Sequence, residues 1–180
     1  MKTYKFKLKG AGHQMLMSPD QKIIAVAGGS VRLFSSLDGK QLGENITVLK
    51  YLHYLAFSHD SRFLAIKNTS GHIAVLDTLG NCIVCKNKIT NVEGCGIYFT
   101  PDDKYIVTGD WDGNIIIFDW GNNQYEILKK FIGSQRKILI NNIQYIYPDT
   151  FIFMVSPIYM DIKVILRKYY VNWEGNCPNC

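Results

Sequence analysis

The residues whose types could support chemistry are the histidines and cysteines, of which the chain has four and five, respectively. The histidines fall in separate parts of the chain, and their spacing does not match a set of metal ligands. Four of the cysteines form two C-x-x-C pairs. Zinc needs four such ligands brought together, and each pair supplies only two. These residues therefore predict no metal site and no cofactor.

The two cysteine pairs differ in context. Cys82 and Cys85 lie in an apolar, β-like run, whose alternation predicts two small buried side chains on opposite faces. Cys177 and Cys180 enclose Pro178, which favours the tight turn of a zinc knuckle. A metal at this second pair would need ligands from another region or another chain, and this alternative stays open.

Familiar catalytic motifs are missing. The sequence has no Gly-rich phosphate loop, no G-x-S-x-G and no H-E-x-x-H. The Gly-Gly-Ser stretch at 28–30 precedes an expected strand, so it cannot present a helix N-terminus to a phosphate. Aspartates in two neighbouring turns are interpreted as turn formers, because a Ca²⁺ site needs about six or more oxygens: Asp102, Asp103, Asp110 and Asp112. We expect a protein that is not an enzyme.

Length and composition limit the class of protein. The 180 residues allow one domain, and shares of 47% hydrophobic and 19% charged residues exclude a disordered chain. No apolar run reaches the roughly 18 residues of a membrane span, and the lysine-rich start lacks the apolar stretch of a secretion signal. We therefore expect a cytoplasmic protein without a membrane span.

The net charge of +5 is spread along the chain, and lysines are dense only at 5–9, where they alternate with apolar residues. Nucleic-acid binders cluster their Lys and Arg on one face. A nucleic-acid partner is therefore not expected, although a basic nucleic-acid or membrane-surface module is kept as an alternative.

The strongest pattern is an internal repeat. A turn-like tripeptide ending in Asp recurs, with its aspartates 40, 42 and 47 residues apart, at 18–20, 58–60, 100–102 and 147–149. Ser, Thr and Asp side chains bond to nearby backbone, and Pro fixes φ at the first corner of a β-turn. Each copy therefore predicts a tight turn at the same point of a repeating unit.

Short apolar strands follow each turn. The predicted second strands are Ile23–Ala27, Phe63–Ile66, Tyr105–Thr108 and Phe151–Val155, and the third strands are Val31–Phe34, Ile73–Asp77, Ile115–Asp119 and Ile162–Leu166. Weaker outer strands are expected near 41–46, 82–86 and 125–130. No segment has a sustained helical period, so each unit is predicted to be a four-stranded antiparallel meander. Residues 115–118 are apolar throughout, which requires cover on both faces of the sheet.

The third unit, Phe99–Asp119, resembles a blade of the WD40-type β-propeller family, with Phe118-Asp119 in place of the family's Trp-Asp. Leu76-Asp77 is the equivalent pair in the second unit, and the family's Gly-His occurs once, at Gly12-His13. The resemblance implies an all-β, β-propeller-like array of about four four-stranded antiparallel blades. It also implies a buried Asp–His–Ser–Trp hydrogen-bond network, for which units two to four lack the histidine.

The blades are expected at residues 10–46, 47–88, 89–131 and 132–176. In closed propellers of this family the N-terminal strand completes the last blade, and residues 3–8 could do so here. Three alternatives follow from the blade number. The chain forms a closed four-blade ring, or an open arc or part of a larger propeller, or an arc that a second copy closes.

Binding is the function that this architecture favours, because loops on a rigid scaffold carry function. We expect a protein-interaction scaffold with an unidentified protein partner. Trp111 is the leading anchor, Tyr51 and Arg136 are further candidates on the same face, and His13 either joins them or supports its own blade. The alternative is an enzyme or small-ligand binder that uses the central channel.

Overall fold

The computed structural model describes residues 12–94, 96–130, 138–146, 150–157 and 163–168, with side chains up to residue 127. These residues form strands, turns and bends. Within these ranges no helix is long and apolar enough to cross a membrane. The turn at 147–149, Arg136, Cys177, Cys180 and the strand expected at 3–8 lie outside the described residues.

The strands form four antiparallel sheets, each built from consecutive strands. The first sheet contains β1 (Gln14–Met17), β2 (Ile23–Ala27), β3 (Val31–Ser35) and β4 (Gln41–Ile46). The second contains β5 (Leu52–Phe57), β6 (Phe63–Asn68), β7 (His72–Asp77) and β8 (Cys82–Lys88). The third contains β9 (Ile97–Phe99), β10 (Tyr105–Gly109), β11 (Asn114–Asp119) and β12 (Gln124–Lys130). The fourth contains β13 (Ile138–Ile146), β14 (Thr150–Pro157) and β15 (Lys163–Lys168).

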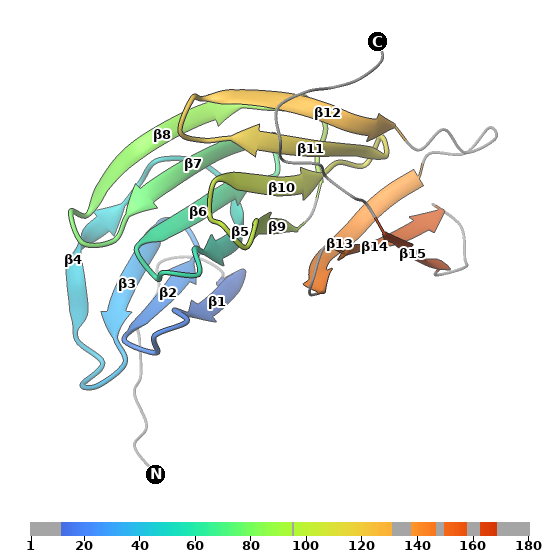
Figure 1. Cartoon of the computed structure of the whole chain (residues 1–180). Helices are drawn as coiled ribbons and strands as arrows, with labels where there is room; N and C mark the ends of the chain where they lie inside the picture. The colour runs from blue at the N-terminus through green and yellow to red at the C-terminus, as the bar shows by residue number, and fades with distance from the viewer. Residues whose placement is uncertain (1–11, 95, 131–137, 147–149, 158–162, 169–180) are drawn as a thin grey trace.

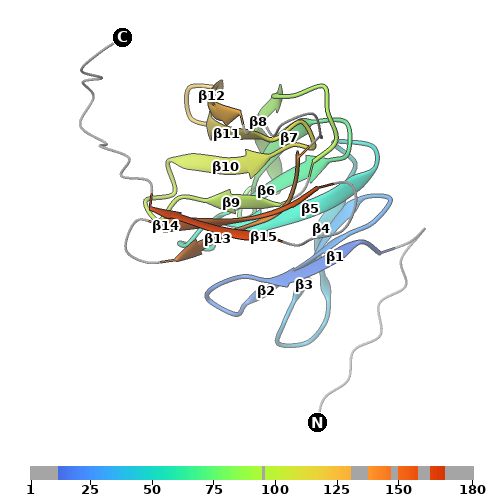
Figure 2. The ribbon, with the colours of Figure 1, turned by 90° about the vertical axis from the view of Figure 1, so that its right-hand side faces the viewer.

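The sheets lie side by side in an arc, with β1, β5 and β9 on its inner side (Figures 1 and 2). β5 contacts both β1 and β9, and β13 contacts β9 and β10. The described strands of the first sheet make no extensive contact with the fourth. The predicted all-β array of antiparallel blades is thus confirmed as an arc that does not close among the described residues.

The recurring tripeptide forms the turn that its residue types predict. In the first sheet, Ser18 Oγ donates to Asp20 Oδ1 at 2.6 Å and accepts from the backbone N–H of Ile23 at 2.9 Å. The same pair of bonds recurs around Ser58 and around Thr100. The residue after each Asp has a positive φ, at Gln21, Ser61 and Asp103. A hydroxyl and a carboxylate therefore hold an unfavourable backbone conformation in each of the three turns.

These turns also join neighbouring sheets. The backbone N–H of Asp20 donates to Ser61 Oγ at 3.0 Å, and that of His59 donates to Asp103 Oδ1 at 2.9 Å. In both cases the acceptor is the positive-φ residue of the next sheet's turn. One turn geometry therefore fixes both the local bend and the spacing to the preceding blade.

Two hydrophobic cores fill the spaces between the first three sheets. The core between the first and second sheets includes Leu33, Leu55, Leu64, Ile66 and Leu76, and the core between the second and third includes Val75, Phe99, Ile106, Ile116 and Phe118. In β11, Ile115, Ile116 and Phe118 are at most 2% exposed. This burial on both sides explains the uninterrupted apolar run.

The prediction that Cys82 and Cys85 point to opposite faces is wrong. Cys82 pairs with Asp77 and Cys85 with Val75, so both cysteines lie on one face of the sheet. A bulge at Val84 inserts one residue between them, and one extra residue reverses the alternation. Cys85 is buried and Cys82 is exposed, so the prediction of two buried side chains holds only for Cys85.

Candidate functional site

One end of the arc carries two kinds of loop from each blade. The connection that enters the first strand and the turn between the second and third strands lie at the same end of an antiparallel meander. In the described residues these are the connections at 47–51 and at 89–96, without residue 95, and the turns at 28–30, 69–71 and 110–113. We call this end the loop face. It carries Tyr51 and Trp111.

Tyr51 combines an exposed ring with an unfavourable backbone. Its φ is +56°, a region that bulky side chains rarely adopt, and the residue is 72% exposed. Hydrogen bonds from the neighbouring turn hold both sides of this position. Asn68 Nδ2 donates to the Lys50 carbonyl at 3.0 Å, and the Thr69 N–H donates to the Tyr51 carbonyl at 3.3 Å. The fold therefore holds an aromatic ring outward in a strained conformation, which is a feature of binding sites.

Asp110 organises the turn below Trp111 in the third blade. The residue is fully buried, and its Oδ1 accepts the backbone N–H groups of Asp112 and Asn114 at 3.1 and 3.0 Å. Its Oδ2 accepts Thr90 Oγ1 at 2.9 Å and Asn114 Nδ2 at 2.8 Å. Thr90, in the connection before β9, thus donates the hydrogen bond that the family resemblance predicts from a histidine.

Asn68 occupies the equivalent position of the second blade. Its Oδ1 accepts the backbone N–H groups of Ser70 and His72 at 3.1 and 2.8 Å, as Asp110 does in its own turn. Its Nδ2 donates to the Lys50 carbonyl. In both turns Oδ1 accepts two backbone N–H groups. The second side-chain atom differs, because Oδ2 of Asp110 faces the hydroxyl donor of Thr90 and Nδ2 of Asn68 faces the carbonyl acceptor of Lys50.

Trp111 lies against the connection at 89–96. Its backbone N–H donates to the Glu93 carbonyl at 2.8 Å, and its side chain is half-buried, with an indole Nε1 that has no hydrogen-bond partner among the described residues. The connection approaches the turn closely, since a Cβ on Gly94 would lie 2.2 Å from the Gly109 carbonyl oxygen. Trp111 is therefore packed on one side and accessible on the other.

His13 lies at the same end of the arc but toward its inner side. Its backbone N–H donates to the Ala27 carbonyl of its own sheet at 3.0 Å. Its exposed ring stacks on His53 of the second sheet, with centroids 4.1 Å apart and an interplanar angle of 22°. The fourth candidate, Arg136, lies outside the described residues.

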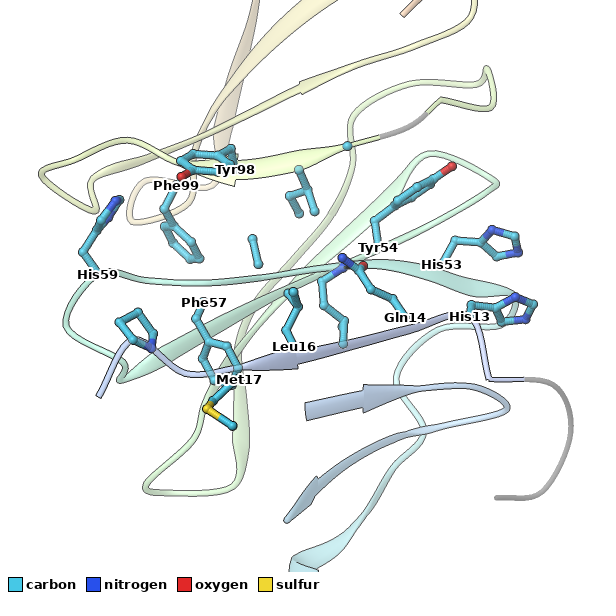
Figure 3. A pocket seen from close by; sticks show the side chains of 15 residues that line it. His13, Gln14, Leu16, Met17, His53, Tyr54, Phe57, His59, Tyr98 and Phe99 are labelled. Atoms are coloured by element: carbon cyan, nitrogen blue, oxygen red, sulfur yellow. Dashed lines mark hydrogen bonds between the residues drawn. The ribbon is translucent and has the colours of Figure 1, made fainter. Parts of the chain in front are cut away.

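A cavity of about 520 Å³ lies on the inner side of the arc, between β1, β5 and β9 (Figure 3). Its lining is aromatic, aliphatic and imidazole-rich, and includes His13, Leu16, His53, Tyr54, Phe57 and Tyr98. Gln14 joins two of its walls, because its Oε1 accepts the backbone N–H of Leu55 at 2.6 Å. The described lining residues include no Asp, Glu, Lys or Arg, so this part of the lining suits an uncharged surface better than an ion.

The two stacked imidazoles make this part of the arc sensitive to acid. Burial lowers the pKa of His53, the nearby His13 lowers this pKa further, and Glu93 opposes both effects. Unfolded histidine titrates near pH 6.5. Below that pH the unfolded chain binds a proton that folded His53 resists, so protonation favours unfolding.

We therefore expect stability to fall as the pH drops below about 6.5, and the His53→Gln variant to lose less stability over this range. The measurement is the melting temperature of both proteins from about pH 7.5 to about pH 5.5. Wild type and variant with the same dependence on pH would contradict the assignment to His53.

Lys67 is a fully buried lysine whose role the sequence does not reveal. It sits in the apolar run of β6 and is fully buried, with Nζ donating to Thr108 Oγ1 at 2.7 Å and to the Gly109 carbonyl at 2.8 Å. Both acceptors belong to the third sheet, directly before Asp110. Only the approach of the two sheets shows that this lysine ties one blade to the next.

Within the described ranges, no group of three or more His, Cys, Asp or Glu side chains is arranged to hold a metal ion. Lys67, Asp110 and the histidine pair each have a role in packing or hydrogen bonding. The geometry of the described residues thus favours contact surfaces, on the loop face and on the inner side of the arc.

Comparison with known proteins identifies the architecture. Residues 80–119 match the family described as WD domain, G-beta repeat. No curated protein matches the sequence. The fold is similar to the crystal structure of RRP9 WD40 repeats, with a TM-score of 0.69 and 14% identity over 83% of this chain and 46% of that chain. It is also similar to the structure of U3-55K, with a TM-score of 0.70 and 13% identity over 88% of this chain and 53% of that chain.

The chain spans about half the length of these solved structures. The matched repeat runs from the turn before β8 to the end of β11, so it includes the best-matching unit of the sequence. Residues 80–119 therefore match a WD40 repeat, and the described part of the chain has the fold of an open row of β-propeller blades.

Proposed function

We propose that the chain is a non-enzymatic protein-interaction scaffold that binds a protein partner through the loop face around Tyr51 and Trp111. The observation that carries this proposal is the exposed ring of Tyr51 at a φ of +56°. Tyr and Trp dominate the residues that contribute most to binding at protein interfaces. The WD40-type fold supplies rigid sheets below the loops, which lowers the entropy that binding would cost.

The Tyr51→Gly variant tests the proposal without damaging the fold. Glycine accepts the positive φ, so the melting temperature should stay the same or rise. Loss of the ring should raise the Kd of a captured partner about 30-fold, which corresponds to about 2 kcal/mol of binding free energy. The measurement is affinity capture from cells with quantitative mass spectrometry, followed by the Kd of each enriched protein.

Leu79→Ala is the matched control, because Leu79 is 81% exposed on a turn at the opposite end of the blades. This variant should bind every partner as strongly as wild type does. Partners that bind wild type and Tyr51→Gly equally well would contradict the proposed site on the loop face.

The inner cavity favours a second function, the binding of a small uncharged ligand. Its volume of about 520 Å³ falls within the usual range for ligand pockets. A small uncharged compound whose binding is lost in Tyr54→Ala and kept in Tyr51→Gly would support this second function. The loop face ranks first because its exposed aromatic ring is held in a strained conformation.

A further inference from the structure

Three exposed lysines lie at the loop face of the second blade: Lys50, Lys86 and Lys88. Lys50 directly precedes Tyr51 in the connection at 47–51, and the other two are near the loop-face end of β8. None of the three makes an ion pair with an Asp or Glu of the described residues. We call these three lysines the basic cluster.

A hydrogen bond places Lys86 on the connection that carries Tyr51. Lys86 Nζ donates to the Val48 carbonyl at 3.1 Å, so its ammonium group lies against residues 47–51. Lys86 and Lys88 share a face of β8, because alternate residues of a strand point to the same side. Both side chains therefore leave the sheet on the side of this connection.

The buried side chain of Asn68 ties the backbone of Lys50 to the same strands. Its Nδ2 donates to the Lys50 carbonyl at 3.0 Å, and its Oδ1 accepts the N–H of His72 at 2.8 Å. His72 is paired with Lys88 across β7 and β8. The backbone of Lys50 is thus held beside the strand pair that ends in Lys88, so the three positive charges belong to one region of the loop face.

Exposed cations at the opposite end of the blades are paired. Each described Lys or Arg of the turns there has an Asp carboxylate within 3.7 Å, in the pairs Lys22–Asp20, Lys40–Asp38, Arg62–Asp77 and Lys104–Asp102. The segments around the basic cluster, at 47–51, 69–71 and 82–88, contain no Asp or Glu. The loops that carry the cluster therefore do not balance its charge, and an anionic partner relieves the repulsion between the lysines.

We propose that the partner binds the loop face through an acidic peptide segment, with carboxylates on the basic cluster and an apolar or aromatic side chain on the ring of Tyr51. This inference rests on the proposed function and adds the chemistry of the partner. Hydrogen bonds from ammonium groups to carboxylates are stronger than those between neutral groups. Complementary charge speeds association and selects the partner, while the Tyr51 ring supplies the desolvated contact that exposed ion pairs lack.

Glu93 favours a peptide over a uniform polyanion. Its carbonyl accepts the N–H of Trp111, and its negative charge acts on His53, where it raises the pKa. The loop face therefore carries positive charge around Tyr51 and negative charge beside Trp111. A peptide can match this change of sign from one residue to the next, whereas nucleic acids and anionic membrane surfaces carry negative charge throughout.

Fluorescence anisotropy of the full chain with a fluorescein-labelled peptide of repeated Glu-Glu-Tyr units tests the inference. A peptide of Gln-Gln-Tyr units is the uncharged control and should bind more weakly. The Lys50→Gln/Lys88→Gln variant should raise the Kd of the acidic peptide about tenfold, because two exposed ion pairs are lost. Lys86 stays in place, since its ammonium group bonds to the Val48 carbonyl.

The matched control is Lys22→Gln/Lys104→Gln. It removes the same net charge from turns at the opposite end of the blades, where both lysines are exposed, and should leave the Kd unchanged. Raising NaCl from about 0.05 to about 0.3 M should weaken wild-type binding several-fold and that of Lys50→Gln/Lys88→Gln less. Tyr51→Gly should also weaken the acidic peptide. Polyuridine RNA and phosphatidylserine vesicles, measured in the same way, should bind more weakly than this peptide.

Equal affinity of wild type and Lys50→Gln/Lys88→Gln for the acidic peptide would overturn the inference, and so would tighter binding of the RNA or the vesicles. If the peptide does not bind while Tyr51→Gly still loses captured partners, the acidic chemistry is wrong and the proposed function stands. Peptide binding that depends on the two lysines and is unchanged in Tyr51→Gly would instead contradict the site around Tyr51, and with it the arrangement inferred here.

Discussion

The Asp110→Ala variant should lose about 3 kcal/mol of unfolding free energy, one of the two largest losses expected from a single change in this chain. The Asp110 carboxylate is fully buried and accepts four hydrogen bonds, two from backbone N–H groups and two from the side chains of Thr90 and Asn114. Alanine leaves these donors buried without an acceptor, and each such donor costs about 1 kcal/mol or more. Urea unfolding followed by circular dichroism measures the change.

Two milder variants separate the contributions of the hydrogen bonds to Asp110 to the free energy of unfolding. Thr90→Val removes two hydrogen bonds, the one that Thr90 Oγ1 donates to Asp110 and the one that it accepts from the Val92 N–H, and should cost about 1 to 2 kcal/mol. Asp110→Asn keeps the Oδ1 acceptor but turns an amide donor toward the donors of Thr90 and Asn114, so its loss should lie between the other two. Asn68 tolerates the amide because its Nδ2 faces the Lys50 carbonyl. Equal stability of Asp110→Ala and Thr90→Val would show that the turn does not depend on the carboxylate.

The Lys67→Ala variant should be destabilised by about 3 to 4 kcal/mol. The side chain is fully buried between the second and third sheets, and Nζ donates to Thr108 Oγ1 and to the Gly109 carbonyl. Alanine creates a cavity and removes the donor of both bonds at once. Because the bonds cross between sheets, their loss should weaken the docking of the third blade more than the folding of either sheet.

Lys67→Met separates packing from hydrogen bonding. Methionine has nearly the same length and carries no charge to desolvate, so this variant should lose only about 1 kcal/mol. Thr108 keeps its own hydrogen bond to the Gly96 carbonyl at 2.7 Å, which limits the loss. Unfolding in urea, with limited proteolysis at the 89–96 connection as a second readout, compares the two variants. Equal losses for alanine and methionine would assign the whole effect to the two hydrogen bonds.

The blades could be predicted because their signals are local. The Ser-Pro-Asp and Thr-Pro-Asp turns bond to their own backbone within five residues, so their residue types alone specify the bend. Apolar runs of four or five residues between such turns then predict strands. The faces of Cys82 and Cys85 were predicted wrongly, because a bulge that no residue type indicates lies between them.

The candidate site was only partly predictable. Tyr51 and Trp111 stood out as aromatic residues in expected loops, but their residue types gave no sign that one is exposed at a positive φ and the other half-buried. The stacking of His13 on His53 joins residues of different blades. Such contacts depend on the distance between sheets, which the order of residues within one repeat does not reveal.

The amino-acid sequence by itself determined the turns and most strands of each unit, since these depend on neighbours within about ten residues, and the recurrence of such units along the chain showed the repeat. Only the tertiary structure decided that Lys67 bonds to the next blade, that Thr90 stands in for a histidine at Asp110, and that Lys86 bonds to the connection that carries Tyr51. The physical reason is that these features arise where sheets meet, at separations of about 20 to 40 residues, and only the packed arc brings such residues within contact distance.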